Sequence, residues 1–66
     1  MTQHRYCTCF LINHPESKLF PWWFLEPEHY VWASSDDEAR DKANELAAEL
    51  TLQYGRKVKL NVFFEA

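Results

Sequence analysis

The sequence predicts an α+β fold in which a three-stranded antiparallel sheet, of order 2-1-3, carries one helix on one face. Three observations lead to this fold: two early segments rich in β-branched and aromatic residues, one long Ala- and Leu-rich segment with a clear start and stop, and an alternating segment at the end. The chain has 66 residues, which allows one small domain over 1–66. A domain this short buries only about 60% of its unfolded surface, so its stability is expected to be marginal unless further contacts add to the core.

The first predicted strand runs from Arg5 to Asn13 and reads RYCTCFLIN. One of its faces carries Tyr6, Thr8, Phe10 and Ile12. The other face carries Arg5, Cys7, Cys9, Leu11 and Asn13. Both faces are apolar enough for a central strand, which accounts for its place in the middle of the predicted sheet.

Two cysteines, Cys7 and Cys9, lie on the same side of this strand. That geometry holds their side chains too far apart for an unstrained disulfide and favours a reduced, cytoplasmic setting. The thiols serve either as small apolar strand residues or as the start of a metal site with His4 or His14. Because no second cysteine pair follows, we favour the first interpretation and expect no metal or cofactor.

The segment 18–28, KLFPWWFLEPE, is very aromatic but is interrupted by Pro21 and Pro27. Proline removes backbone donors, so the segment is predicted to be a loop or an irregular edge strand before a second strand, His29–Ala33. Trp22 and Trp23 cannot both point inward from an extended backbone, so one of them should be partly exposed. The rings of this segment either complete a small core or contact a partner.

Ser35 followed by Glu38 is a capping-box pattern and predicts a helix from Asp36 to Tyr54, with Gly55 as the residue that ends it. Its predicted apolar stripe consists of Ala39, Ala43, Leu46, Ala47, Leu50 and Tyr54. The last predicted strand, residues 57–65, alternates so that one face carries Val58, Leu60, Val62 and Phe64. One helix covers one face of the sheet, so the aromatic loop or a second copy of the chain is expected to cover the other.

The chain carries no catalytic motif, and its single glycine excludes a Gly-rich phosphate loop. We therefore expect a protein that is not an enzyme. The longest apolar run is too short to span a bilayer, and no basic start precedes an apolar run, so we expect neither a membrane segment nor a signal peptide.

Charge is unevenly distributed along the chain, whose formal net charge is −3. Residues 26–49 hold eight acids and two bases, and residues 50–66 hold three bases and one acid. An acidic ridge of i,i+4 spacing on the helix consists of Asp37, Asp41, Glu45 and Glu49. The ridge is either a solvated outer face or a surface for a basic partner.

The function predicted from these features is protein binding, through the ridge, through the uncovered sheet face, or through the aromatic residues Trp22, Trp23 and Phe24. A homodimer is one form of such binding. The alternative is a small nucleic-acid-associated module that uses aromatic residues together with Arg56, Lys57 and Lys59. The acidic excess argues against this alternative, because a polyanion requires a basic surface.

The run Val31–Ala39, VWASSDDEA, followed by Ala43, reads as a strand, a serine cap and an acidic helix start. This pattern resembles that of small phage-encoded and mobile-element proteins of β-β-α-β type. The resemblance covers about a third of the chain. It implies a small accessory protein that acts by binding a host protein, and it assigns no individual residue.

Overall fold

The computed structural model describes residues 2–66, with the side chains of 26–28 excepted. The chain forms strand β1 (His4–Asn13), strand β2 (Trp22–Ala33), helix α1 (Asp36–Tyr54) and strand β3 (Val58–Glu65). The strands make one sheet of order β2-β1-β3, in which β1 is antiparallel to both neighbours. The predicted α+β fold and strand order are confirmed.

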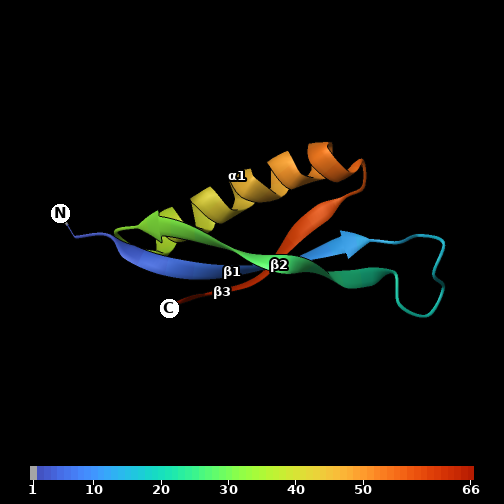
Figure 1. Cartoon of the computed structure of the whole chain (residues 1–66), viewed down its shortest axis with the longest axis horizontal. Helices are drawn as coiled ribbons and strands as arrows, with labels where there is room; N and C mark the ends of the chain where they lie inside the picture. Colours follow the sequence, from blue (N-terminus) through green and yellow to red (C-terminus); the bar gives the residue numbers. More distant parts are fainter. Residues whose placement is uncertain (1) are drawn as a thin grey trace.

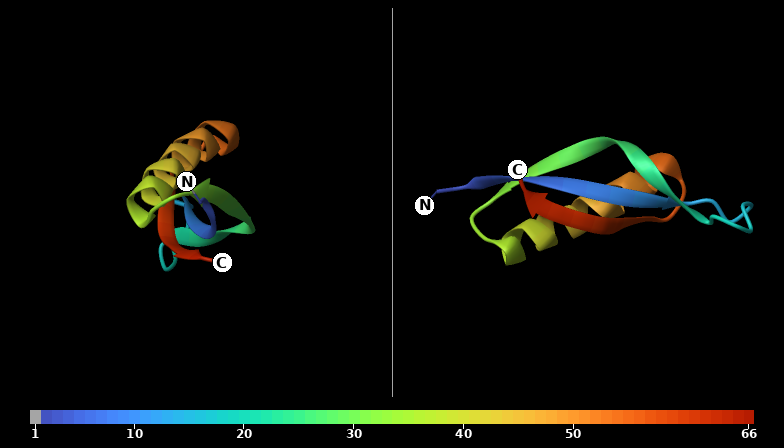
Figure 2. Two further views of the ribbon diagram at one scale, coloured as in Figure 1. Left: turned by 90° about the vertical axis from the view of Figure 1, so that its left-hand side faces the viewer. Right: turned by 90° about the horizontal axis from the view of Figure 1, so that it is seen from below.

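The molecule is elongated, with extents of 45 × 20 × 18 Å. Helix α1 lies along one side of the sheet, and the loop between β1 and β2 projects beyond the end of the helix (Figure 1). Both chain termini lie at the opposite end of the molecule from this loop (Figure 1). The views from the end and from below show the same arrangement, with the helix on one side of the strands (Figure 2). Within the part of the chain that the structure describes, α1 therefore covers one side of the sheet and leaves the other side uncovered.

Helix α1 begins and ends where the sequence predicts. The Ser35 Oγ accepts a hydrogen bond from the backbone N–H of Glu38 at 3.2 Å, which satisfies one of the free donors of the first turn. At the other end Gly55 has φ 70°, and its N–H donates to the carbonyl of Thr51 at 3.0 Å. Only glycine adopts this left-handed conformation without a steric cost.

The core lies between α1 and the near face of the sheet. Its buried apolar residues are Tyr6, Phe10, Ile12, Ala33, Ala39, Ala43, Ala47, Leu50 and Val58. The small alanines of α1 allow the helix to lie close to the strands. Tyr54 was predicted to belong to the apolar stripe, but at the last residue of the helix it is 42% exposed and does not join the buried core.

Strand β2 is longer than the predicted second strand and is the irregular edge strand that the prolines suggested. Thr8 lies opposite His29, whereas Phe10 lies opposite Leu25, so residues 26–28 stand against the single residue Cys9. The bulge contains Pro27, which has no N–H to donate, and an edge bulge is a position where strands tolerate proline. The Thr8 hydroxyl donates to the carbonyl of His29 at 2.7 Å and fixes β2 beside the bulge.

Strand β3 contains a second bulge that corrects the predicted alternation. Cys9 lies opposite Val62 and Phe10 lies opposite Leu60, so Asn61 is an extra residue. Val58, Leu60, Val62 and Phe64 were predicted to share one face, but only the first two face α1, whereas Val62 and Phe64 are turned to the other side of the sheet. Phe63 takes their place under the helix, where it packs against Tyr6 at a ring-centroid distance of 6.2 Å.

Candidate interaction surface

The side of the sheet that faces away from α1 is termed here the open face. Residues opposite each other in paired strands share a face, so the register identifies its members. The open face consists of Arg5, Cys7, Cys9, Leu11, Asn13, Trp22, Phe24, Tyr30, Trp32, Lys59, Val62 and Phe64. Large side chains on β2 and β3 thus flank small thiols and a leucine on the central strand.

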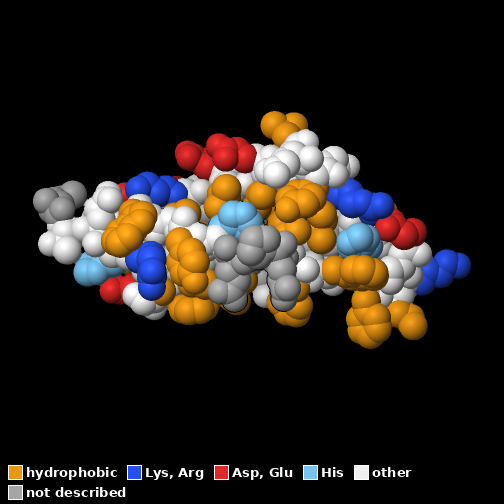
Figure 3. Space-filling view, in the orientation of Figure 1, with side chains coloured by type: hydrophobic (Ala, Val, Ile, Leu, Met, Phe, Trp, Pro, Cys, Tyr) orange, Lys and Arg blue, Asp and Glu red, His pale blue; other side chains and the backbone are white. Residues whose placement is uncertain are grey.

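Four aromatic rings of the open face are mostly or half exposed. The exposed fraction is 73% for Phe24, 55% for Trp32, 53% for Phe64 and 52% for Tyr30. Val62 between them is also about half exposed. In Figure 3, hydrophobic side chains line the lower side of the molecule, which is the side away from α1. An apolar surface of this extent on so small a protein is typical of an interaction site.

The charges of the open face are positive. The Arg5 guanidinium lies over the Tyr30 ring at 5.0 Å, and the Lys59 ammonium lies over the Trp22 ring at 4.0 Å. Glu65 lies opposite Tyr6 and therefore belongs to the helix side of the sheet. The side chains of 26–28 apart, the open face carries no carboxylate.

The acidic ridge lies on a different surface from the open face. Asp37, Asp41, Glu45 and Glu49 are all exposed. They lie on α1, and acidic side chains are seen on the helix at the top of Figure 3. Asp37 pairs with Arg40 at 3.4 Å. The predicted contact residues are therefore split, because the sheet lies between the ridge and the open-face residues Trp22 and Phe24.

The three predicted aromatic contacts are also divided between two surfaces. Trp22 and Phe24 belong to the open face, where Trp22 is half-buried. Trp23 lies opposite Ile12 and so points to the other side. The prediction that adjacent tryptophans face opposite ways is confirmed. Trp23 is half exposed, and its ring stacks on His14 with centroids 4.1 Å apart and planes at 29°.

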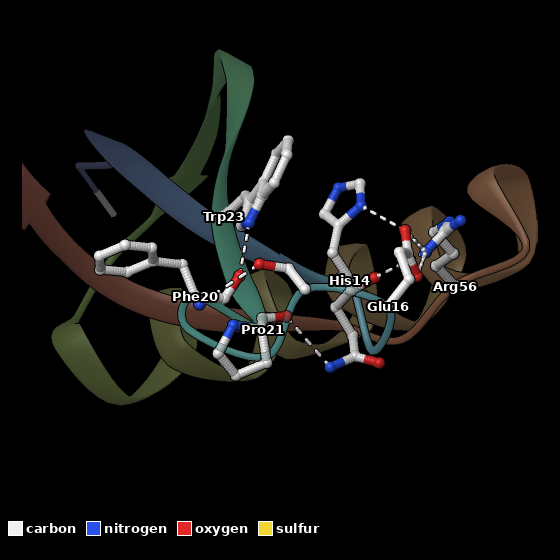
Figure 4. Close-up of polar contacts among 8 residues, drawn as sticks. His14, Glu16, Phe20, Pro21, Trp23 and Arg56 are labelled. Atoms are coloured by element: carbon white, nitrogen blue, oxygen red, sulfur yellow. Dashed lines mark hydrogen bonds and ion pairs between the residues drawn. The ribbon is translucent and has the colours of Figure 1, made fainter.

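The loop between β1 and β2 is held by a network of polar contacts (Figure 4). Glu16 is at its centre, with a carboxylate oxygen 3.0 Å from an Arg56 guanidinium nitrogen and 3.1 Å from His14 Nδ1. The bond from Arg56 is the largest of the effects that lower the Glu16 pKa to about 2. The Trp23 indole N–H donates to the Phe20 carbonyl across the same loop. Leu19 and Phe20 are mostly exposed at its tip.

The predicted basic set is not one surface. Arg56 is bound to Glu16 and also donates to the backbone carbonyl of Asn13 at 3.3 Å. Lys59 lies on the open face over Trp22, and Lys57 is exposed just before β3. The cations that do share a surface with exposed rings are Lys59 and Arg5.

Cys7 and Cys9 are not joined by a disulfide. Cys7 is buried and Cys9 is half-buried, so both occupy the centre of the open face as small strand residues. Within the described residues, no three His, Cys, Asp or Glu side chains are grouped to hold a metal ion.

Sequence reasoning anticipated an uncovered sheet face but missed several of its most exposed members. Tyr30 and Trp32 alternate with the half-buried Val31 and the buried Ala33, and this alternation could have placed both rings on the uncovered face. Val62 and Phe64 could not be assigned, because the bulge at Asn61 reverses their side.

Helix α1, the helix that the described residues form, is not long and apolar enough to cross a membrane. Comparison with family models, with curated proteins and with solved structures finds no match to the chain.

Proposed function

We propose that this protein is a non-enzymatic protein-interaction module whose open face binds a protein surface. The observation that carries the proposal is the group of four half-exposed or mostly exposed rings on one face of a 66-residue chain. Removal of exposed aromatic surface from water stabilises a complex by about 25 cal/mol per Å². A broad sheet face matches the extended surface of a protein better than the enclosed shape of a small molecule.

The residue types of the open face support the same function. Tryptophan, tyrosine and arginine are the residues that most often dominate the energy of protein interfaces. Trp32, Tyr30 and Arg5 lie together at one end of the open face, with Arg5 already stacked on Tyr30. A host-protein target, a phage or mobile-element origin and a cytoplasmic location stay predictions.

A site-specific photo-cross-linker at position 64 tests the proposal. Benzoylphenylalanine in place of Phe64 is expected to form covalent adducts with one protein species in cells that express the chain. Leu52 is the matched control, because it is 86% exposed but lies on α1. The same cross-linker at position 52 is expected to give no adduct of that mass. Adducts with nucleic acid, or no adduct from position 64, would contradict the proposal.

A second candidate function is binding of a single-stranded nucleic acid on the same face. The observation that favours it is the pairing of exposed rings with Arg5 and Lys59 on a face without described carboxylates. Bases stack on such rings, and cations neutralise the phosphates. Retention on immobilised single-stranded DNA that falls steeply with salt would support this candidate.

A further inference from the structure

We infer that the protein surface covering the open face is the open face of a second copy of this chain. This inference rests on the proposed function and names its partner. In the resulting dimer, two sheets pack against each other and the two α1 helices lie outside, in the order helix, sheet, sheet, helix. Such a contact uses the same patch on both copies and closes with twofold symmetry.

The area of the open face matches the need of a stable dimer. A fully enclosed aromatic side chain buries about 150–250 Å², so the four exposed rings leave roughly 400–500 Å² of apolar surface open. Val62, Leu11, Cys9 and the half-buried Trp22 extend this surface. The total approaches the ~800 Å² that each partner contributes to a standard interface.

The shape of the open face suits a copy of itself. Two antiparallel sheets pack face to face at about 10 Å with strands nearly aligned. The rings of the neighbouring strands, such as Tyr30 and Phe64, flank Cys7, which is only 3% exposed, so the middle of the open face is filled. The half-exposed rings of one copy would therefore meet those of the other between the two sheets.

The charge distribution permits this contact although each copy carries a net charge of −3. The acidic ridge lies on α1, so in the dimer the two ridges lie on opposite outer surfaces. Two sheets and two helices separate them by several times the Debye length, which is about 8 Å at physiological salt. The charged groups of Arg5 and Lys59 lie over the Tyr30 and Trp22 rings. Their long apolar stems allow these groups to reach the wet rim when the two faces pack.

The competing contact through the edge of β2 is blocked by the sequence. Pro21 precedes this edge strand and Pro27 lies within it, where residues 26–28 form the bulge. Proline and bulges both interrupt the row of backbone groups that another strand would need. A second copy is therefore not expected to add a strand at the β2 edge of the sheet.

Sedimentation equilibrium of the full chain over a range of concentrations tests the inference. The wild type is expected to show a monomer–dimer equilibrium in the micromolar range. Tyr30→Lys and Phe64→Lys are each expected to raise the dissociation constant about 100-fold or more, since each change occurs twice in a twofold interface. Leu52→Lys, on the outer side of α1, is expected to leave it unchanged. Because Tyr30 and Phe64 are each about half exposed, the two lysine variants are expected to stay folded, and circular dichroism checks this.

Alkylation of Cys9 provides a second measurement. Cys9 is half-buried in the middle of β1 and would be enclosed in the inferred dimer. In a Cys7→Ala variant, the rate at which iodoacetamide alkylates Cys9 is expected to fall as the protein concentration rises above the dissociation constant. The same variant with Tyr30→Lys is expected to show a rate that does not depend on concentration.

The outcomes separate the inference from the proposed function. A wild type that stays monomeric, or a dimer that both lysine variants leave intact, overturns the inference. If the monomeric chain still forms an adduct with a different protein from position 64, the proposed function holds and only the identity of the partner is wrong. If position 64 gives no protein adduct, both fail. A dimer dissociation constant that does not rise with salt supports an apolar contact between two copies. Retention on single-stranded DNA that falls steeply with salt would instead support the nucleic-acid candidate.

Discussion

The Thr51 hydroxyl joins the last turn of α1 to the start of β3, and its removal is the sharpest test of how the sheet is positioned. It donates to the carbonyl of Ala47 at 2.9 Å and lies 3.3 Å from the carbonyl of Val58. It also accepts the backbone N–H of Val58 at 2.9 Å. Thr51 is half-buried and Val58 is only 2% exposed, so water does not readily replace this acceptor.

Thr51→Val keeps the shape of the side chain but leaves the Val58 N–H without its acceptor. An unsatisfied buried donor costs about 1–3 kcal/mol. A chain of 66 residues is expected to have a total stability of roughly 3–10 kcal/mol at 0.05–0.15 kcal/mol per residue. One hydroxyl therefore accounts for a large share of the free energy of unfolding.

Thermal denaturation followed by circular dichroism measures the effect. All variants are compared at one protein concentration, because the inferred self-association would add a concentration-dependent contribution to stability. Thr51→Val should lower the melting temperature by at least about 4–8 °C, the shift expected for each 1 kcal/mol in a domain of this size. Thr51→Ser retains the hydroxyl and should unfold near the wild type. Equal midpoints for the wild type and Thr51→Val would refute the reasoning.

Three further predictions concern the helix end and two shifted pKa values. Gly55→Ala should cost about 1 kcal/mol in urea denaturation from backbone strain alone, since no atom lies within 4 Å of the added Cβ at φ 70°; an unchanged midpoint would contradict it. The Glu16 pKa is lowered from 4.5 to about 2, chiefly by Arg56, so this stabilisation is complete above pH 4.5 and lost as the pH falls toward 2. The protection of loop amides against hydrogen exchange, corrected for the intrinsic pH dependence of exchange, should fall over that range, and a Glu16→Gln variant should lack this dependence. The Tyr6 pKa is raised from 10 to about 12, chiefly because its hydroxyl donates to Asp36 at 2.8 Å, so this stabilisation is complete below pH 10 and lost as the pH rises toward 12. Denaturation midpoints should fall across that interval in the wild type but not in Tyr6→Phe.

Local signals in the sequence were sufficient for the helix and for the order of the strands. Ser35 and Gly55 cap the two ends of α1, and the preference of serine and glycine for these positions depends only on the neighbouring backbone. Both ends of α1 could therefore be predicted. The strand order followed from connectivity, because a helix between the second and third strands leaves the first strand as the natural centre.

The open face could be predicted only in outline, because its membership depends on pairing between distant strands. The bulge at Asn61 exists in relation to Cys9 and Phe10 of β1, and nothing in the alternating residues of β3 indicates it. The bulge at 26–28 similarly carries β2 back to Trp22, past the proline that limited the predicted strand. Both bulges occur at the same point of β1, where its two neighbours change register.

The extra residue in β3 makes a single pairing choice decisive for the surface of this protein. Asn61 is taken up by the bulge, so Leu60 and Val62 lie opposite consecutive residues of β1 and their side chains lie on opposite sides of the sheet. If β3 paired with β1 without this bulge, Val62 and Phe64 would turn beneath the helix, and Phe63 and Glu65 would turn outward. Deletion of Asn61, in contrast, would remove the bulge and keep Val62 opposite Cys9, so the oily surface would survive the loss of this codon.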